Sequence, residues 1–421
     1  MNARAYKAIP SPSPEADRAW RAVTAADVRK AIDGTLIGDM VNILQSVTVP
    51  PLPLELTLPK ALALAGCGMS QPDQEIAKDE NAPPGIHRSR FRIATAGGQS
   101  CNVWSLIVAL SGTGKDIGNL ADNVASLHGL HVGTSGSAEG LADAFTENGA
   151  GLLMASEFAP YMDAKAWQHH AADFLTHAWN KGHFRVNLSK RSGNTSPRES
   201  KYCYPSIVAN IQPRTFTERF DMLAVESGFL GRFLVSYMPD GTAHRPRCGA
   251  VDMVKELDEC FLCFLRCHGV YTPPEGYLGD VLTMFVEQGA EYPAAYSRLV
   301  NEYGPRFACM LACKTDGSIR VEPHHWDGAA VLVQWFYSKA EALFGMASGS
   351  PYERKREDQL DKLASYIKGH SPCRRSVLSQ RFSRGTTATE RDRLCAELAE
   401  RGRILVNRGE GGRVEYVHLR D

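Results

Sequence analysis

The segment SGTGKD, from Ser111 to Asp116, has the composition of a loop that binds phosphate groups. Glycine leaves backbone N–H groups uncovered, and these donors, with the start of a following helix, can hold a polyphosphate. The lysine after the second glycine can place an ammonium group against the outer phosphates. We therefore expect a nucleotide to be bound by Ser111, Gly112, Thr113, Gly114, Lys115 and Asp116.

Two positions depart from the usual G-x-x-x-x-G-K-[ST] pattern. Ala109 replaces the first glycine, and Asp116 replaces the Ser or Thr whose hydroxyl normally contacts Mg²⁺. The alternative interpretation is a glycine-rich turn that binds no nucleotide.

A second group of candidate residues follows the apolar segment 152–155, which we expect to be a short buried strand. ATPases with a phosphate-binding loop place an acidic pair here: one member lies near Mg²⁺ and the other polarises the attacking water. In this chain the pair is Ser156 and Glu157. We expect Glu157 to orient water, and Asp116 with Ser156 to hold Mg²⁺ from positions that lie side by side. The alternative is a site that binds nucleotide without hydrolysing it.

Four further side chains are candidates for contact with the γ-phosphate. Asn210 and Gln212 follow a buried strand, 204–211, where a polar group can sense that phosphate. Arg232 lies between a glycine-rich turn and a strand, and could enter the site of a neighbouring subunit. Arg306 begins an apolar helix and could reach back to the nucleotide. The alternatives are satisfied turn residues for Asn210 and Gln212, and an ion-paired surface arginine for Arg232.

Two stretches are rich in basic residues. The first, 181–201, suits a DNA backbone in a channel, or is a solvated loop. The second belongs to the last seventy residues, which suit duplex DNA or, alternatively, a protein partner. The candidate DNA contacts are Lys181, Arg185, Lys190, Arg191, Arg374, Arg375, Arg381, Arg391 and Arg393.

These side chains require an α/β fold to position them. We expect strands over 91–96, 104–110, 152–155 and 204–211, and helices over 115–127, 138–148 and 167–179. Before them we expect helices over 17–32 and 36–45, a Pro-rich connector over 49–59 and a helix over 59–66. A linker over 351–356 should lead to helices over 359–369, 376–383 and 387–402, and to two strands around Gly409–Gly412, which together make a winged helix. The expected domains are an N-terminal segment 1–50, a core 51–245, a helical region 246–350 and a winged helix 351–421.

Composition restricts the class of protein. The chain has 421 residues, a formal net charge of zero and 43% hydrophobic residues, so we expect two or three domains and only local basic patches. The 11 cysteines are scattered, which favours a reducing cytoplasm over a disulfide framework. Cys260, Cys263 and Cys267 have the spacing of buried thiols on one helix face rather than of a zinc site. We expect no transmembrane helix and no membrane partner.

The motifs SGTGKD, SAEGLADAF, GLLMASEFAPYM, NIQP, GFLGRF and YGPRFACMLAC, in this order, resemble a family of mobile-element P-loop proteins of phages, prophages and plasmids. The resemblance covers about residues 50 to 345. The family is similar to replicative helicases and to the helicase halves of primase-helicases. The resemblance implies a RecA-like or AAA-like core, ATP and Mg²⁺, ring oligomers such as hexamers, and work on DNA.

The sequence therefore predicts an ATP-driven, ring-forming DNA helicase or translocase that acts in replication of a mobile element. One alternative is an ATPase that loads another helicase or melts an origin. Another is a nucleotide-sensing, DNA-binding regulator with little hydrolysis.

Overall fold

The chain forms two compact units, Met1–Met346 and Ala347–Asp421. The structure, a computed structural model, describes residues 23–95, 97–115, 120–133, 137–162, 166–186, 197–220, 225, 228–239, 246–249, 252–274, 292–347, 351–382, 388–408 and 414–418. Each unit is described by itself below.

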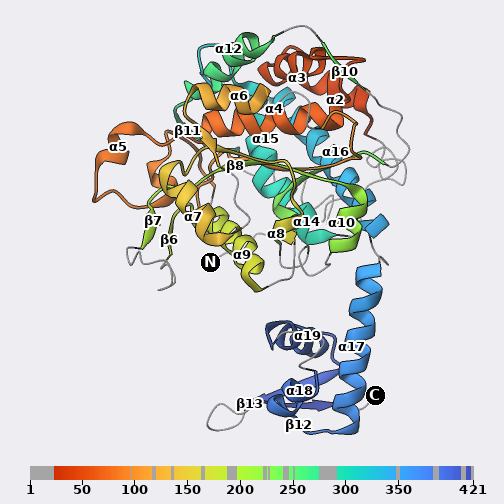
Figure 1. The fold of residues 1–421 in the computed structure, drawn as a ribbon. Coiled ribbons are helices and arrows are strands. Elements are labelled where there is room, and N and C mark those ends of the chain that lie inside the picture. Colours follow the sequence, from red (N-terminus) through yellow and green to blue (C-terminus); the bar gives the residue numbers. More distant parts are fainter. Residues whose placement is uncertain are drawn as a thin grey trace, which may run out of the picture. The chain divides into compact units, whose positions relative to one another are not determined.

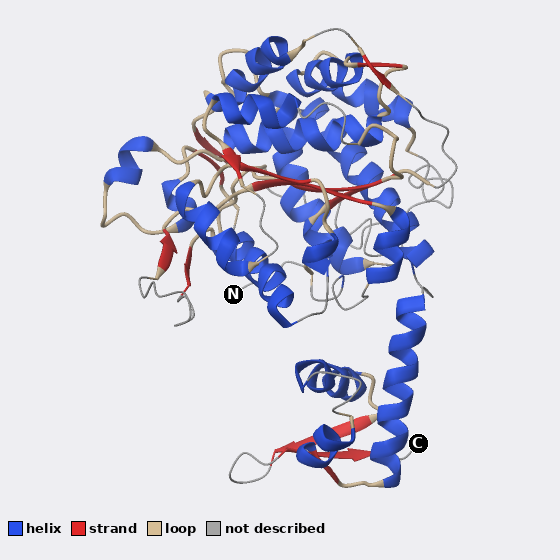
Figure 2. Ribbon diagram, viewed as in Figure 1, coloured by secondary structure: helices blue, strands red, loops and turns tan. Residues whose placement is uncertain are grey.

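A five-stranded parallel sheet organises the first unit (Figures 1 and 2). Its strands, in spatial order, are β4 (His131–Val132), β5 (Leu152–Ala155), β8 (Ser206–Ile211), β3 (Trp104–Val108) and β9 (Leu234–Tyr237). The predicted mixed α/β fold is confirmed at this level, with strands where 104–110, 152–155 and 204–211 were expected.

The central strands are buried along their whole length because both faces of the sheet are covered. Every residue of β3 (WSLIV) and of β8 (SIVANI) is buried. Near-continuous apolar runs of this kind are typical of parallel strands between two helical layers. The layers here are α4 (Leu54–Met69) and α6 (Leu120–Leu127) on one face, and α7 (Ala138–Glu147), α8 (Ala159–Met162) and α9 (Ala166–Lys181) on the other (Figure 1).

Helix α4 corrects the expectation of a Pro-rich connector over 49–59. It begins at Leu54 and continues through Pro59, and every residue except Glu55 is buried. Pro59 has no N–H to donate to the carbonyl of Glu55 four residues earlier. Ser236 of β9 replaces that donor, since its hydroxyl donates to the Glu55 carbonyl at 2.6 Å. The helix therefore tolerates an internal proline because a distant strand satisfies the orphaned carbonyl.

The remaining helices of the first unit agree partly with the expectations. Thr24 begins α2 (Ala25–Ile32) with a capping box to Asp27, as its spacing indicates, whereas 17–22 lie outside the described residues. The others are α3 (Leu36–Ser46), α5 (Gln74–Lys78), η1 (Gly85–Arg88), α10 (Pro213–Arg219), η3 (Leu230–Arg232), α12 (Val254–Leu265), α14 (Pro293–Arg298), the π-helical turn η4 (Leu299–Tyr303), α15 (Gly304–Ala312) and α16 (Pro323–Ala347).

Among the described residues of the first unit, three small strand pairs lie outside the main sheet. β1 (Thr48–Val49) pairs with β10 (Arg247–Cys248), and β6 (Phe184–Val186) pairs with β7 (Arg198–Ser200). The strand expected over 91–96 is β2 (Phe91–Ile93), which pairs with β11 (Gly269–Tyr271) rather than with β3. It therefore adds no strand beside the glycine-rich turn.

The second unit contains three helices and a three-stranded sheet. The elements are α17 (Pro351–Gly369), β12 (Cys373–Arg374), α18 (Arg375–Arg381), α19 (Ala388–Glu400), β13 (Ile404–Arg408) and β14 (Val414–His418), with strand order β12-β14-β13. The expected linker 351–356 is instead the first part of α17. The expected turn Gly409–Gly412 lies outside the described residues.

Candidate functional site

The connections that leave the neighbouring strands β3 and β8 run in opposite directions across the sheet. After β3 it passes through α6 to β4 at one end of the sheet, and after β8 it passes to β9 on the other side of β3. In open α/β sheets, a crevice forms outside the carboxyl ends of two strands whose connections diverge in this way. The glycine-rich turn directly follows β3 and therefore lies at the carboxyl edge, at the position where such folds form this crevice.

The turn has the backbone conformations that its glycines permit. Gly112 has φ 77° and Gly114 has φ 93°, a left-handed region that other residues avoid. The Thr113 hydroxyl donates to the Leu110 carbonyl at 2.8 Å and closes the turn from within. A Cβ added at Gly112 would meet nothing within 4 Å, so the outer side of the turn is open. This geometry leaves room for a phosphate-bearing ligand against the backbone.

Lys60 of α4 donates a hydrogen bond to the backbone of the turn, a contact that was not predicted from the sequence. Its side chain is buried in α4, 1% exposed, and its ammonium donates to the Lys115 carbonyl at 2.7 Å. Lys115 itself is 4% exposed. Lys60 is the one charged residue between Leu56 and Met69, and a lysine within such a long apolar segment could have identified it.

Ser156 and Glu157 lie at the same edge of the sheet, both exposed at the end of β5. The register aligns Ala155 with Ala209 of β8, and Ala209 with Leu106 of β3. Strand β8 thus separates β5 from β3, and two strand spacings are roughly 10 Å. We expected the strand before Ser156 to be the direct neighbour of the strand before the glycine-rich turn. This expectation is wrong, because β8 lies between β5 and β3. Asp116 itself lies outside the described residues.

Glu157 is held by its own loop. Its Oε1 accepts a hydrogen bond from the Ala159 N–H at 3.2 Å. The following residue, Phe158, donates its N–H to the Asn210 carbonyl at 2.9 Å, so this loop remains attached to the end of β8. The carboxylate is therefore fixed at the carboxyl edge while it remains exposed.

The two candidate phosphate sensors differ in exposure. Asn210 is 3% exposed and is aligned with Ile107 of β3, which is in turn aligned with Ser236. Ser236 faces α4, and residues in register on parallel strands share a face, so Asn210 also faces the α4 layer. Gln212 is partly exposed at the start of α10, without a side-chain capping bond. Of the two, Gln212 lies nearer the open surface.

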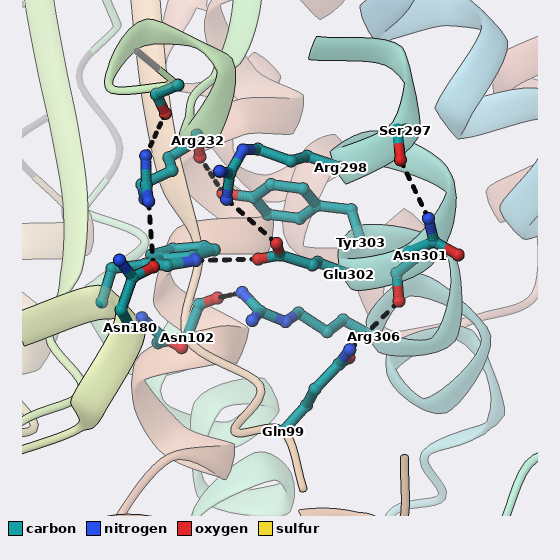
Figure 3. A network of polar contacts seen from close by, with 12 residues as sticks. Gln99, Asn102, Asn180, Arg232, Ser297, Arg298, Asn301, Glu302, Tyr303 and Arg306 are labelled. Carbon is teal, nitrogen blue, oxygen red and sulfur yellow. Dashed lines mark hydrogen bonds and ion pairs between the residues drawn. The ribbon is translucent and has the colours of Figure 1, made fainter. Parts of the chain in front are cut away.

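The structure does not bring Arg306 to the turn. Its guanidinium donates to the carbonyl of Asn102 and lies 4.5 Å from the ring of Trp179 (Figure 3). Asn102 precedes β3 whereas the turn follows it, and the chain from Asn102 to Val108 spans about 20 Å. The expected second sensing arginine is therefore at the opposite, amino edge of the sheet.

Arg232 lies at the amino edge as well, at the end of η3 and before β9. It is 3% exposed and donates to the Gly228 carbonyl and to Asn180 Oδ1 (Figure 3). Burial, followed by the neighbouring Arg298, lowers the pKa of Arg232 to about 10. In this structure Arg232 is therefore an internal, hydrogen-bonded cation rather than a side chain presented to another subunit.

The basic stretch 181–201 forms a hairpin in its described part. Lys181 is exposed at the end of α9, and Arg185 on β6 lies 3.8 Å from Glu199 on β7. Lys190 and Arg191 lie outside the described residues. The described hairpin strands thus supply few unpaired cations for a DNA backbone.

The basic residues of the second unit are largely engaged within it. Arg375 forms an ion pair with Asp392 through two hydrogen bonds, and Arg374 lies 3.4 Å from Glu415. Arg391 is 8% exposed, so it is a buried rather than a DNA-facing residue, which corrects that expectation. Arg381 is exposed and Arg393 is partly exposed. Arg374, Arg375 and Arg381 are exposed, so the unit keeps surface cations, of which Arg374 and Arg375 each face a carboxylate.

Among the described residues, no group of three or more His, Cys, Asp or Glu side chains is arranged to hold a metal. All 11 cysteines are free thiols. Of the three expected to be buried on one helix face, Cys263 is buried in α12, Cys267 is buried just beyond the end of the helix, and Cys260 is partly exposed. Within the part of the chain that is described, no helix is long and apolar enough to cross a bilayer.

Comparison of the chain with protein-family models and with curated proteins finds no match.

Proposed function

We propose that the first unit is a P-loop ATPase with a RecA-like or AAA-like core, which binds MgATP at the turn 111–115. The observation that carries the proposal is the position of this turn. It lies at the crevice where the connections of β3 and β8 diverge, with Glu157 and Gln212 at the carboxyl ends of neighbouring strands.

The residues of the edge suit this chemistry. Backbone N–H groups at Gly112 and Gly114 would face phosphate oxygens, and Lys115 would neutralise their charge once its ammonium turns toward the crevice. Glu157 would orient the attacking water. Mg²⁺, when bound, would offset charge on the β- and γ-oxygens, and the exposed Ser156 hydroxyl would be its candidate ligand among the described residues.

The wider proposal is a ring-forming DNA helicase or translocase of a mobile element. The second unit has three helices and strand order β12-β14-β13, which suit a winged helix that contacts DNA. Its candidate DNA contacts are the hairpin β6–β7 and the exposed or partly exposed basic residues Lys181, Arg374, Arg375, Arg381 and Arg393. Hexameric assembly around single-stranded DNA belongs to this proposal.

Turnover of ATP tests the enzymatic part. We expect DNA-stimulated ATP hydrolysis that Glu157→Gln lowers by about 10²- to 10⁴-fold, because a positioned base contributes that much. Glu147→Gln, at an exposed residue at the end of α7, is the matched control and should leave the rate unchanged. A Glu157→Gln protein with full turnover would remove the catalytic assignment, and strand displacement on forked DNA would separate a helicase from a loader.

A second candidate function is a nucleotide-sensing, DNA-binding regulator with little hydrolysis. It is favoured by Asp116 in place of Ser or Thr and by Ser156 in place of a carboxylate. This candidate predicts nucleotide binding without DNA-stimulated turnover.

A further inference from the structure

A cavity of about 520 Å³ lies at the amino edge of the sheet, on the opposite side from the glycine-rich turn. Its wall is formed by residues 97–100 before β3, by the end of α9, and by η4 and α15. Cavities of about 300–1,000 Å³ are typical of sites for small organic ligands.

The wall of this cavity carries excess positive charge. Arg306 is 4% exposed, and Lys181 is exposed at the rim. Glu302 also lines the cavity, but its carboxylate already accepts from Arg298 at 3.1 Å and from Trp179 Nε1 at 2.8 Å. Within the described chain, neither Arg306 nor Lys181 forms an ion pair. Two cations therefore face the cavity without a carboxylate of their own.

Further positive charge lies next to the residues that line the cavity. A Cβ at Gly228 would lie 2.8 Å from Arg298 Nη2 and 3.1 Å from Arg232 Nη1, so two guanidinium groups approach one point. Glu302 pairs with Arg298, whereas Arg232 and Arg306 donate to neutral oxygens, those of Asn180 and Asn102 (Figure 3). Buried cations are costly unless anions compensate them. An anion in the cavity would supply that compensation.

Neutral polar groups complete the cavity. Gln99 donates from Nε2 to the Asn301 carbonyl at 3.1 Å, while its Oε1 is buried without a described hydrogen-bond partner. Arg306 Nε is also buried without a described hydrogen-bond partner. Asn180 stands on the wall beside Lys181 and accepts a bond from Arg232 at 2.9 Å. Incompletely bonded groups of this kind are typical of the wall of a site that a ligand completes.

We propose that this cavity binds a small phosphorylated molecule, of about the size of a mononucleotide, whose phosphate lies between Lys181 and Arg306. A guanidinium and an ammonium suit phosphate oxygens, and the amides of Gln99 and Asn180 suit the rest of a polar ligand. The site is separate from the turn 111–115, so it does not depend on nucleotide binding there.

Calorimetric titration of the Lys115→Ala protein with AMP and with pyrophosphate tests the proposal, since this background removes the lysine of the turn. We expect one-to-one binding of at least one probe. Adding Lys181→Ala should raise the Kd about tenfold, the usual loss for a bond to a charged group. Lys181 is exposed, so this variant should keep its fold. Lys255→Ala, at an exposed lysine of α12, is the control and should leave the Kd unchanged.

Arg306→Lys keeps the charge but loses the planar fork, and should weaken binding of the same probe. Absence of binding by both probes at millimolar concentration would overturn the proposal. Binding that is indifferent to Lys181→Ala would also overturn it. Lys181-dependent binding of a single-stranded oligonucleotide, with no binding of AMP or pyrophosphate, would assign the rim to nucleic acid instead.

Discussion

Replacement of Lys60 by methionine should weaken nucleotide binding without unfolding the protein. Lys60 donates to the Lys115 carbonyl at 2.7 Å from a side chain that is 1% exposed. A hydrogen bond from a charged donor contributes about 1.5–3 kcal/mol, so its loss from the turn should raise the Kd for ATP about ten- to a hundredfold. Methionine has a similar shape and removes the cost of burying an ammonium, so the free energy of unfolding should change much less.

Fluorescence titration with a labelled ATP analogue measures this Kd, and a urea titration of the same samples measures the free energy of unfolding. Lys255→Met, at an exposed lysine distant from the turn in the sequence, should change neither quantity. A folded Lys60→Met protein whose Kd stays within about twofold of the unsubstituted protein would show that the ammonium does not position the turn.

Three further predictions concern stability and DNA. Ser236→Ala should lower the free energy of unfolding by about 1–3 kcal/mol in a urea titration, because the Glu55 carbonyl loses its donor. Adding Pro59→Ala should recover part of this loss, since the alanine N–H restores a donor to that carbonyl. Equal losses in the single and the double variant would contradict this. Burial, then His324 and Lys314, lower the pKa of His325 below 6.5, so the folded state binds this proton less tightly than the unfolded state. Stability should therefore fall as the pH drops below 6.5, and His325→Asn should flatten this dependence in urea titrations at pH 7.5 and 5.5. Arg381→Ala should weaken duplex binding and reduce its salt slope by about 1 in anisotropy titrations; an unchanged slope would remove Arg381 from the contacts.

The carboxyl edge of the sheet was largely predictable from local patterns. Apolar runs over 104–110, 152–155 and 204–211 predicted three strands, and the residues after them had to share one edge once those strands were parallel. The order of the strands was not predictable, because it depends on which apolar surfaces meet over long sequence separations. For that reason Ser156 was expected next to β3, whereas β8 lies between.

Arg232 and Arg306 show a second limit of prediction from the sequence. Arg232 precedes β9, and a residue before a parallel strand must lie at the amino edge, so its position could have been derived from the predicted strand. Arg306 is different, since its direction is set by Trp179 and Asn102, more than a hundred residues earlier. Helix α4 shows the same dependence on distant partners, because Pro59 is acceptable only when Ser236 supplies a donor.

The position of ATP is tested most directly by calorimetric titration of the unsubstituted protein and of Lys115→Ala with MgATP, with Lys255→Ala as control. We expect the turn to bind one ATP per chain, with a Kd that Lys115→Ala raises about a hundredfold and Lys255→Ala leaves unchanged. Equal affinities in all three proteins, or no binding by the unsubstituted protein, would contradict the assignment of residues 111–115 as a phosphate-binding loop.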